Sequence, residues 1–232
     1  MCRHTWTRRL SDTHATSCRD NKTNCVATCP IRAFEGLAVA VLRRQLSYGS
    51  DDTAVVLVGT QRDLLTDPGV VAKLVDLTAA ARASGLPVVY ALALPPTPEN
   101  GIRYPTPSQR ALLKGELLRP GTPGADIHPD LAPQRDDVVM KPGAGLSAFA
   151  GTELGARLSA LGAERIVVAG ARTDVEVEST ARDAVELGLQ TTVVSDCCAG
   201  TSAGNHRASI ATTLPRVVHG VLTLDHLTAR MR

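Results

Sequence analysis

The sequence predicts an α/β fold, in which helices cover both faces of a parallel β-sheet. Short aliphatic runs alternate with longer stretches of helical period along the chain, a pattern typical of strand–helix–strand units. The short runs are rich in valine and continuously apolar, as expected for strands that are buried on both faces. We therefore predict a six-stranded parallel sheet in a Rossmann-like three-layer α/β/α sandwich with right-handed crossovers.

Most of these elements end at glycine. Gly59 closes the first strand, whereas Gly85, Gly162 and Gly188 follow helical stretches, where a left-handed residue is favoured. The predicted strands are residues 54–59, 87–94, 138–140, 165–170, 190–195 and 216–219. The predicted helices are residues 69–84, 152–161, 174–187, 203–214 and 224–231, with a shorter one inside 109–118.

Residues 95–137 interrupt this rhythm. They are rich in proline and glycine and show little periodicity outside the short helix. So long a connection inside a compact domain usually has a function. We expect it to form a lid over a site or a contact between subunits.

The composition is that of one globular domain. The chain has 232 residues, of which 44% are hydrophobic and 21% charged, and a net charge of +2. No apolar run approaches the ~18 residues of a membrane span, and no global basic field points to nucleic acid. We expect one domain over residues 34–232, without membrane or nucleic-acid partners.

Residues 1–33 differ from this domain, because they hold six lysines and arginines but only two aspartates. Four of the six cysteines also lie there, at Cys2, Cys18, Cys25 and Cys29. They form no CxxC pair, so their spacing matches no zinc site, and we expect a polar, poorly ordered extension. The domain itself contains only the adjacent Cys197 and Cys198, which suits a reducing cytoplasm.

The stretch Arg165–Ala184 is the strongest candidate for a functional site. It reads as a buried strand, a turn with glycine and a helix, and ligands of open α/β sheets bind beyond the carboxyl ends of such strands. Glu176 lies at the start of that helix, and two interpretations are open. Glu176 forms a capping box with Thr173, or its carboxylate points into a pocket and takes part in chemistry.

Several sequence blocks resemble the isochorismatase-like, or cysteine hydrolase, superfamily. The resemblance covers residues 54–228 and is carried by Val138-Val-Met-Lys-Pro142, Leu146-Ser-Ala-Phe-Ala-Gly-Thr-Glu-Leu154, Gly170-Ala-Arg-Thr-Asp-Val-Glu-Val-Glu-Ser-Thr-Ala-Arg-Asp-Ala184 and Val193-Val-Ser-Asp-Cys-Cys-Ala199. It implies a Rossmann-like sheet of six strands, a small-molecule substrate and association into homodimers or larger oligomers. It also implies an aspartate after the first strand, a lysine after the third and a cysteine nucleophile after the fourth.

This chain departs from the family pattern at two of those three positions. The lysine falls on Lys141, but the aspartate position is Gly59 and the cysteine position is Glu176. Without the cysteine there is no thiolate to form a thioester. The histidines that metal-binding members carry after the first strand are absent from the sequence, so we expect no metal, and no other cofactor. The resemblance further implies a cis peptide between Ala171 and Arg172.

We therefore expect a small-molecule hydrolase of atypical mechanism, with Glu176 and Lys141 as its catalytic pair. The bond that it cleaves would be an ether, epoxide, ester or amide, in a substrate of specialised metabolism. The alternative is a catalytically silent homologue that binds a ligand or assembles oligomers. The expected substrate-binding residues are Gln61, Asp63, Arg172, Phe149 and Gly59. Three of them have plainer roles open to them: Asp63 as a helix cap, Arg172 as a solvent-exposed side chain and Phe149 as core.

Overall fold

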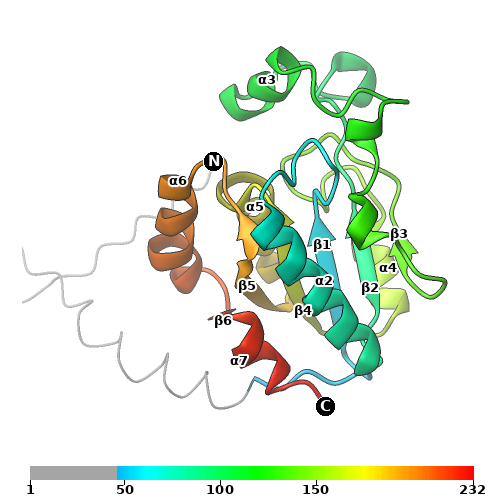
Figure 1. Ribbon diagram of the computed structural model, residues 1–232, viewed down its shortest axis with the longest axis vertical. Helices are drawn as coiled ribbons and strands as arrows, with labels where there is room; N and C mark the ends of the chain where they lie inside the picture. The colour runs from blue at the N-terminus through cyan, green and yellow to red at the C-terminus, as the bar shows by residue number, and fades with distance from the viewer. Residues whose placement is uncertain (1–45) are drawn as a thin grey trace, which may run out of the picture. The chain divides into compact units, whose positions relative to one another are not determined.

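The structure, a computed structural model, describes residues 46–232. Its centre is a six-stranded parallel sheet with the strand order β3-β2-β1-β4-β5-β6 (Figure 1). The strands are β1 (Thr53–Val58), β2 (Val88–Ala91), β3 (Val138–Val139), β4 (Arg165–Ala171), β5 (Gln190–Ala199) and β6 (Gly220–Leu222). The prediction of a six-stranded parallel sheet is thus confirmed.

Helices cover both faces of this sheet. They are α2 (Pro68–Ala83), α3 (Pro107–Lys114), α4 (Leu154–Ala160), α5 (Glu178–Glu186), α6 (Ala203–Ala208) and α7 (Leu224–Thr228). In Figure 1, α2 and α7 lie in front of the sheet and contact each other, whereas α4 and α5 lie behind it. The three layers arise because the connection from β1 to β2 contains α2, whereas those from β3 to β4 and from β4 to β5 contain α4 and α5.

The core is aliphatic, as the low aromatic content predicts. Every residue of β1 is at most 3% exposed, and Ile166 to Ala169 of β4 are fully buried. The two strands pair over six positions, from Thr53 opposite Arg165 to Val58 opposite Gly170. Strands that are covered on both faces need continuous apolar runs, which is why these segments were recognisable in the sequence.

The C-terminal part of the prediction needs correction. The strand expected at residues 216–219 is wrong, because the observed strand is Gly220–Leu222. A Cβ atom on Gly220 would lie 2.8 Å from the Cδ1 atom of Leu46, so a larger residue there would require the Leu46 side chain to move. The helix expected at 203–214 is α6 followed by a π-helical turn, Ser209–Thr213, and a short 3-10 turn with Pro215. Proline lacks the N–H that a continuing helix requires.

The topology places a crevice between β1 and β4. The chain runs from β1 outward to β2 and β3 and returns on the other side of β1 as β4. In open α/β sheets such a reversal opens a binding crevice at the carboxyl ends of the two strands. The strands approach closely there, because Gly170 has a φ of 132° and a Cβ atom on it would overlap the Val58 carbonyl.

No helix within residues 46–232 is long and apolar enough to cross a membrane. The N-terminal extension predicted at residues 1–33, its cysteines and the domain boundary at 34 lie outside the described residues. At the start of the described part, Tyr48 forms an isolated parallel bridge with Met231, near the C-terminus.

Candidate active site

A small cavity occupies the carboxyl end of the sheet, where β1, β2 and β3 end. We call it the inner cavity. Its polar and charged lining groups include Lys141, Ser147, Thr152 and Glu176, and its apolar wall includes Val58, Ala91, Leu92, Met140 and Leu146. Its volume is about 20 Å³, and a single water molecule needs about 10–15 Å³ on the same measure. In this conformation the inner cavity therefore has room for about one water.

Glu176 is the most unusual group in the inner cavity. It lies on a π-helical turn, Thr173–Val177, that leads into α5, and it is only 5% exposed. Its Oε1 atom lies 2.9 Å from Nη1 of Arg172, but its Oε2 atom has no hydrogen-bond partner among the described residues. Burial raises the pKa of Glu176 to about 7, although the Arg172 guanidinium lowers that pKa. Glu176 can therefore accept or donate a proton near neutral pH.

The capping box expected for Thr173 and Glu176 does not form. Arg172, rather than Thr173, occupies the cap position, and no side chain caps the turn. The Thr173 hydroxyl lies 2.9 Å from Nδ1 of His206 instead. Because the first turn is π-helical, the spacing of an α-helical cap does not apply. Glu176 is therefore not used as a helix cap.

The expected cis peptide between Ala171 and Arg172 is also absent, since residues 46–232 contain only trans peptides. The backbone turns at Arg172 itself, which has a φ of 59° and a ψ of 59°. This left-handed conformation costs a non-glycine residue about 1–2 kcal/mol. It sends the Arg172 side chain towards Glu176, four residues along the chain.

Lys141 and Gly59 both line the inner cavity. Lys141 follows β3 and is exposed. Gly59 follows β1 with a φ of 61°, and a Cβ atom on it would lie 3.1 Å from Leu64. Glu176 is thus the only carboxylate among the residues that line the inner cavity.

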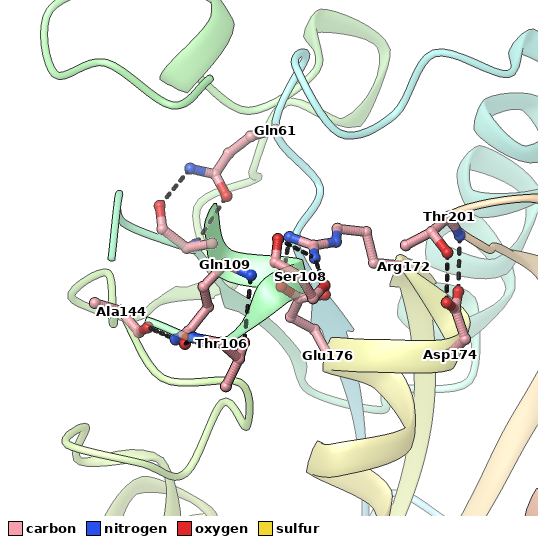
Figure 2. A network of polar contacts seen from close by, with 10 residues as sticks. Gln61, Thr106, Ser108, Gln109, Ala144, Arg172, Asp174, Glu176 and Thr201 are labelled. Atoms are coloured by element: carbon pink, nitrogen blue, oxygen red, sulfur yellow. Dashed lines mark hydrogen bonds and ion pairs between the residues drawn. The ribbon is translucent and has the colours of Figure 1, made fainter. Parts of the chain in front are cut away.

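Arg172 connects the inner cavity to the Pro-rich segment. Its side chain is 9% exposed, and its Nη2 atom donates to both the carbonyl and the hydroxyl oxygen of Ser108, on α3. Figure 2 shows the guanidinium between Ser108 and Glu176. The neighbouring Gln109 holds α3 in place, because its side chain donates to the Ala144 carbonyl and accepts from the Thr106 N–H. Residues 95–137 thus contact the site, whereas their role as a lid or a subunit contact stays a prediction.

A second, larger space lies on the other side of this contact. We call it the outer groove, and it has a volume of about 560 Å³. Arg172 and Ser108 line it together with Asp63, Leu112, Asp174 and Asn205, whereas Glu176 does not. The guanidinium therefore stands between the outer groove and the carboxylate of the inner cavity.

The remaining predicted residues lie near the inner cavity but do not line it. Gln61 is 2% exposed. Its side-chain amide donates hydrogen bonds to the carbonyl oxygens of Ala93 and Ala125 and accepts one from the Ala93 N–H. Asp63 lines the outer groove and accepts a 2.7 Å hydrogen bond from the Leu118 N–H. Phe149 packs against the core and lines a separate surface hollow. Gln61 and Asp63 thus hold the Pro-rich segment against the loop after β1.

Sequence reasoning did not find Ser108, the partner of Arg172. The only local signal is the sequence Thr106-Pro-Ser-Gln109 at a helix start, which predicts a capped helix but not its position. Among the described residues, no three His, Cys, Asp or Glu side chains are grouped as metal ligands would be. Glu176 and Lys141 are the only ionisable residues that line the inner cavity, and a carboxylate there suits proton transfer.

Known proteins are similar to this chain in both sequence and fold. The model of the family described as "Isochorismatase domain" matches residues 53–224. The isochorismatase family protein YecD of Escherichia coli O157:H7 is 32% identical over 188 residues, which is 74% of this chain and 93% of YecD. The ureidoacrylate amidohydrolase RutB of Pantoea ananatis is 32% identical over 68% of this chain and 67% of its own. A crystal structure of a cysteine hydrolase from Pseudomonas syringae pv. phaseolicola has a TM-score of 0.70, at 25% identity over 81% of this chain and 95% of its own.

Proposed function

We propose that this chain, which belongs to the isochorismatase family of hydrolases, hydrolyses small molecules. Its reactive group would be Glu176, at the position where the family has a nucleophilic cysteine. The observation that carries the proposal is the free Oε2 atom of a buried carboxylate, which borders a cavity with room for one water. A buried group without a partner costs free energy. Such a cost is typical of functional sites, where a group is kept ready for a substrate.

In the proposed reaction, Glu176 is a general base and then a general acid. Its carboxylate takes a proton from water as the water oxygen bonds to the electrophilic carbon of an ester, amide or epoxide. The bond from that carbon to the leaving oxygen or nitrogen breaks, and the leaving group receives the proton from Glu176. Lys141, which also lines the cavity, stabilises the negative charge that develops on oxygen. For an ether, Glu176 protonates the leaving oxygen first.

A carboxylate with a pKa near 7 suits this work, because it is ionised in a large fraction of molecules yet basic enough to take a proton. Direct attack by the Glu176 carboxylate on the substrate is the other route that the same geometry allows. The two routes differ in whether oxygen from solvent enters the Glu176 carboxylate. Hydrolysis in ¹⁸O-labelled water, followed by mass spectrometry of the peptide that contains Glu176, distinguishes them.

The test is hydrolysis of a panel of small esters, amides, epoxides and vinyl ethers by the wild type, Glu176→Gln and Lys141→Met. We expect kcat/KM to fall about 10²–10⁴-fold in Glu176→Gln and about 10²-fold in Lys141→Met. Glu178→Gln is the matched control, because Glu178 is two residues away and pairs with Arg182 and Ser209 instead. If Glu176→Gln keeps wild-type activity, the assignment of Glu176 is wrong.

One observation favours a second candidate, a catalytically silent protein that binds a ligand or assembles oligomers. The inner cavity is too small for an organic substrate, and Arg172 is paired with its only carboxylate. If the wild type and both variants are equally inert across the whole panel, the silent protein is the better account.

A further inference from the structure

One side chain separates two spaces of very different size. The inner cavity, with Glu176, measures about 20 Å³, whereas the outer groove, of about 560 Å³, falls within the range of about 300–1,000 Å³ typical of small-molecule sites. The Arg172 guanidinium lies between them, within 2.9 Å of Glu176 on one side and in contact with Ser108 on the other. A ligand in the outer groove therefore meets Arg172 before it can reach Glu176.

The backbone of Arg172 is strained, and its guanidinium has hydrogen-bonding capacity that is not used. Its backbone is left-handed, with a φ of 59°, and strained residues of this kind concentrate at binding sites and switches. Its Nη1 atom is buried without a well-directed hydrogen bond, although it forms the ion pair with Glu176. A guanidinium carries five N–H donors that fit a carboxylate through two parallel bonds. The single contact with Oε1 of Glu176 leaves that capacity unused.

We propose that the outer groove binds a small molecule with one carboxylate, and that this carboxylate replaces Glu176 as the partner of the Arg172 guanidinium. The inference rests on the proposed function in one respect, since it takes Glu176 as the reactive group. It names the substrate class of that site: a carboxylic acid with its scissile bond on the side that faces the inner cavity. Arg172 is then a specificity-determining residue, which binds the substrate and exposes Glu176 in one movement.

The other charges in the outer groove favour a monoanion over a phosphate. Asp63 and Asp174 both line it, and each is already bonded, Asp63 to the Leu118 N–H and Asp174 to the N–H and hydroxyl of Thr201. Their negative charges therefore remain in place. A ligand with two charges meets twice the repulsion from them, whereas a single carboxylate on Arg172 meets the least.

The exchange also couples ligand binding to a proton. The Arg172 guanidinium lowers the pKa of Glu176, so the loss of that contact raises it and Glu176 takes up a proton near pH 7. Besides Arg172, Asp174 on the same turn acts on the pKa of Glu176. Lys141 lines the same cavity, and Asp63 lines the outer groove. A carboxylate ligand should thus bind with uptake of up to one proton, and more tightly at pH 6 than at pH 8.

The experiment is titration calorimetry of the full chain with benzoate at pH 7, with benzamide as the neutral isostere. We expect benzoate to bind at least ten times more tightly than benzamide. Arg172→Met should abolish this preference, and Arg172→Lys, which keeps the charge but loses the planar fork, should weaken it about tenfold. Arg182→Met is the matched control, because Arg182 forms an ion pair of the same spacing with Glu178 and is 47% exposed. It should bind benzoate like the wild type.

Glu176→Gln separates this inference from the proposed function. The variant should lose hydrolysis, yet bind benzoate more tightly than the wild type, because the competing charge on Arg172 is gone. Proton uptake, measured in buffers of different ionisation enthalpy, should vanish in the same variant. Equal binding of benzoate and benzamide, or unchanged benzoate affinity in Arg172→Met, would overturn the inference and leave the hydrolytic role of Glu176 standing. If Glu176→Gln binds benzoate tightly but still hydrolyses substrates, the proposed function fails and the binding site stands.

Discussion

The pH dependence of stability gives a direct test of how Glu176 is buried. In the unfolded chain a glutamate has a pKa near 4.5, and in the folded protein burial raises the pKa of Glu176 to about 7. Between these values the unfolded state has released the proton and the folded state still holds it. Stability is therefore lost as the pH rises from about 4.5 to about 7, and the loss is complete above that range. Glutamine at position 176 has no proton to lose.

The size of the effect follows from the interval of about 2.5 pH units between the two values. At about 1.4 kcal/mol for each unit, the full difference is about 3–4 kcal/mol, of which about 2–3 kcal/mol falls between pH 5 and pH 8. The gap in free energy of unfolding between Glu176→Gln and the wild type should grow by that amount, in favour of the variant. Urea unfolding of both proteins at pH 5 and pH 8 measures it. A gap that stays constant within about 0.5 kcal/mol would refute the burial argument.

Four further substitutions test the packing of the domain. Gly170→Ala places a methyl group on the Val58 carbonyl and should leave no soluble folded protein. Gly188→Ala, at a left-handed glycine with open space around it, should lower the stability measured by thermal unfolding by only about 1 kcal/mol. Asp137→Ala removes the carboxylate that lies 2.6 Å from Arg82. Because the Asp137 side chain is only 4% exposed, the free energy of unfolding in urea should fall by about 2–3 kcal/mol. Leu154→Ala empties a fully buried site and should cost about 2–5 kcal/mol on the same measure.

The sequence was sufficient for most of the fold because burial leaves a pattern in it. Apart from Thr53 and Arg165 at their first positions, β1 and β4 are apolar throughout, since both faces of those strands are covered. β6 has no such run, because it is three residues long, begins at a glycine and follows a proline-containing turn. Its place in the sheet comes from pairing with β5, a tertiary contact that has no local signal.

The site was predictable only where the chain keeps a family motif. The resemblance brought Lys141 and Glu176 to one cavity, and the structure places both in its lining. It gave no indication of the Arg172 ion pair, because the expected capping box and cis peptide described a different turn. The contact with Ser108 could not be predicted either, since α3 is positioned by bonds between distant residues, such as that of Gln109 to Ala144.

The central position of β1 also affects how this protein folds during its synthesis. β1 pairs with β2 on one side and with β4 on the other, yet more than a hundred residues of chain separate β1 from β4. While the ribosome is still producing those residues, one edge of a strand that is apolar from Ala54 to Val58 has no partner. Pairing between distant segments is slow, and an open apolar edge invites association with other chains. We expect the nascent protein to depend on chaperones until Gly170 has left the ribosome.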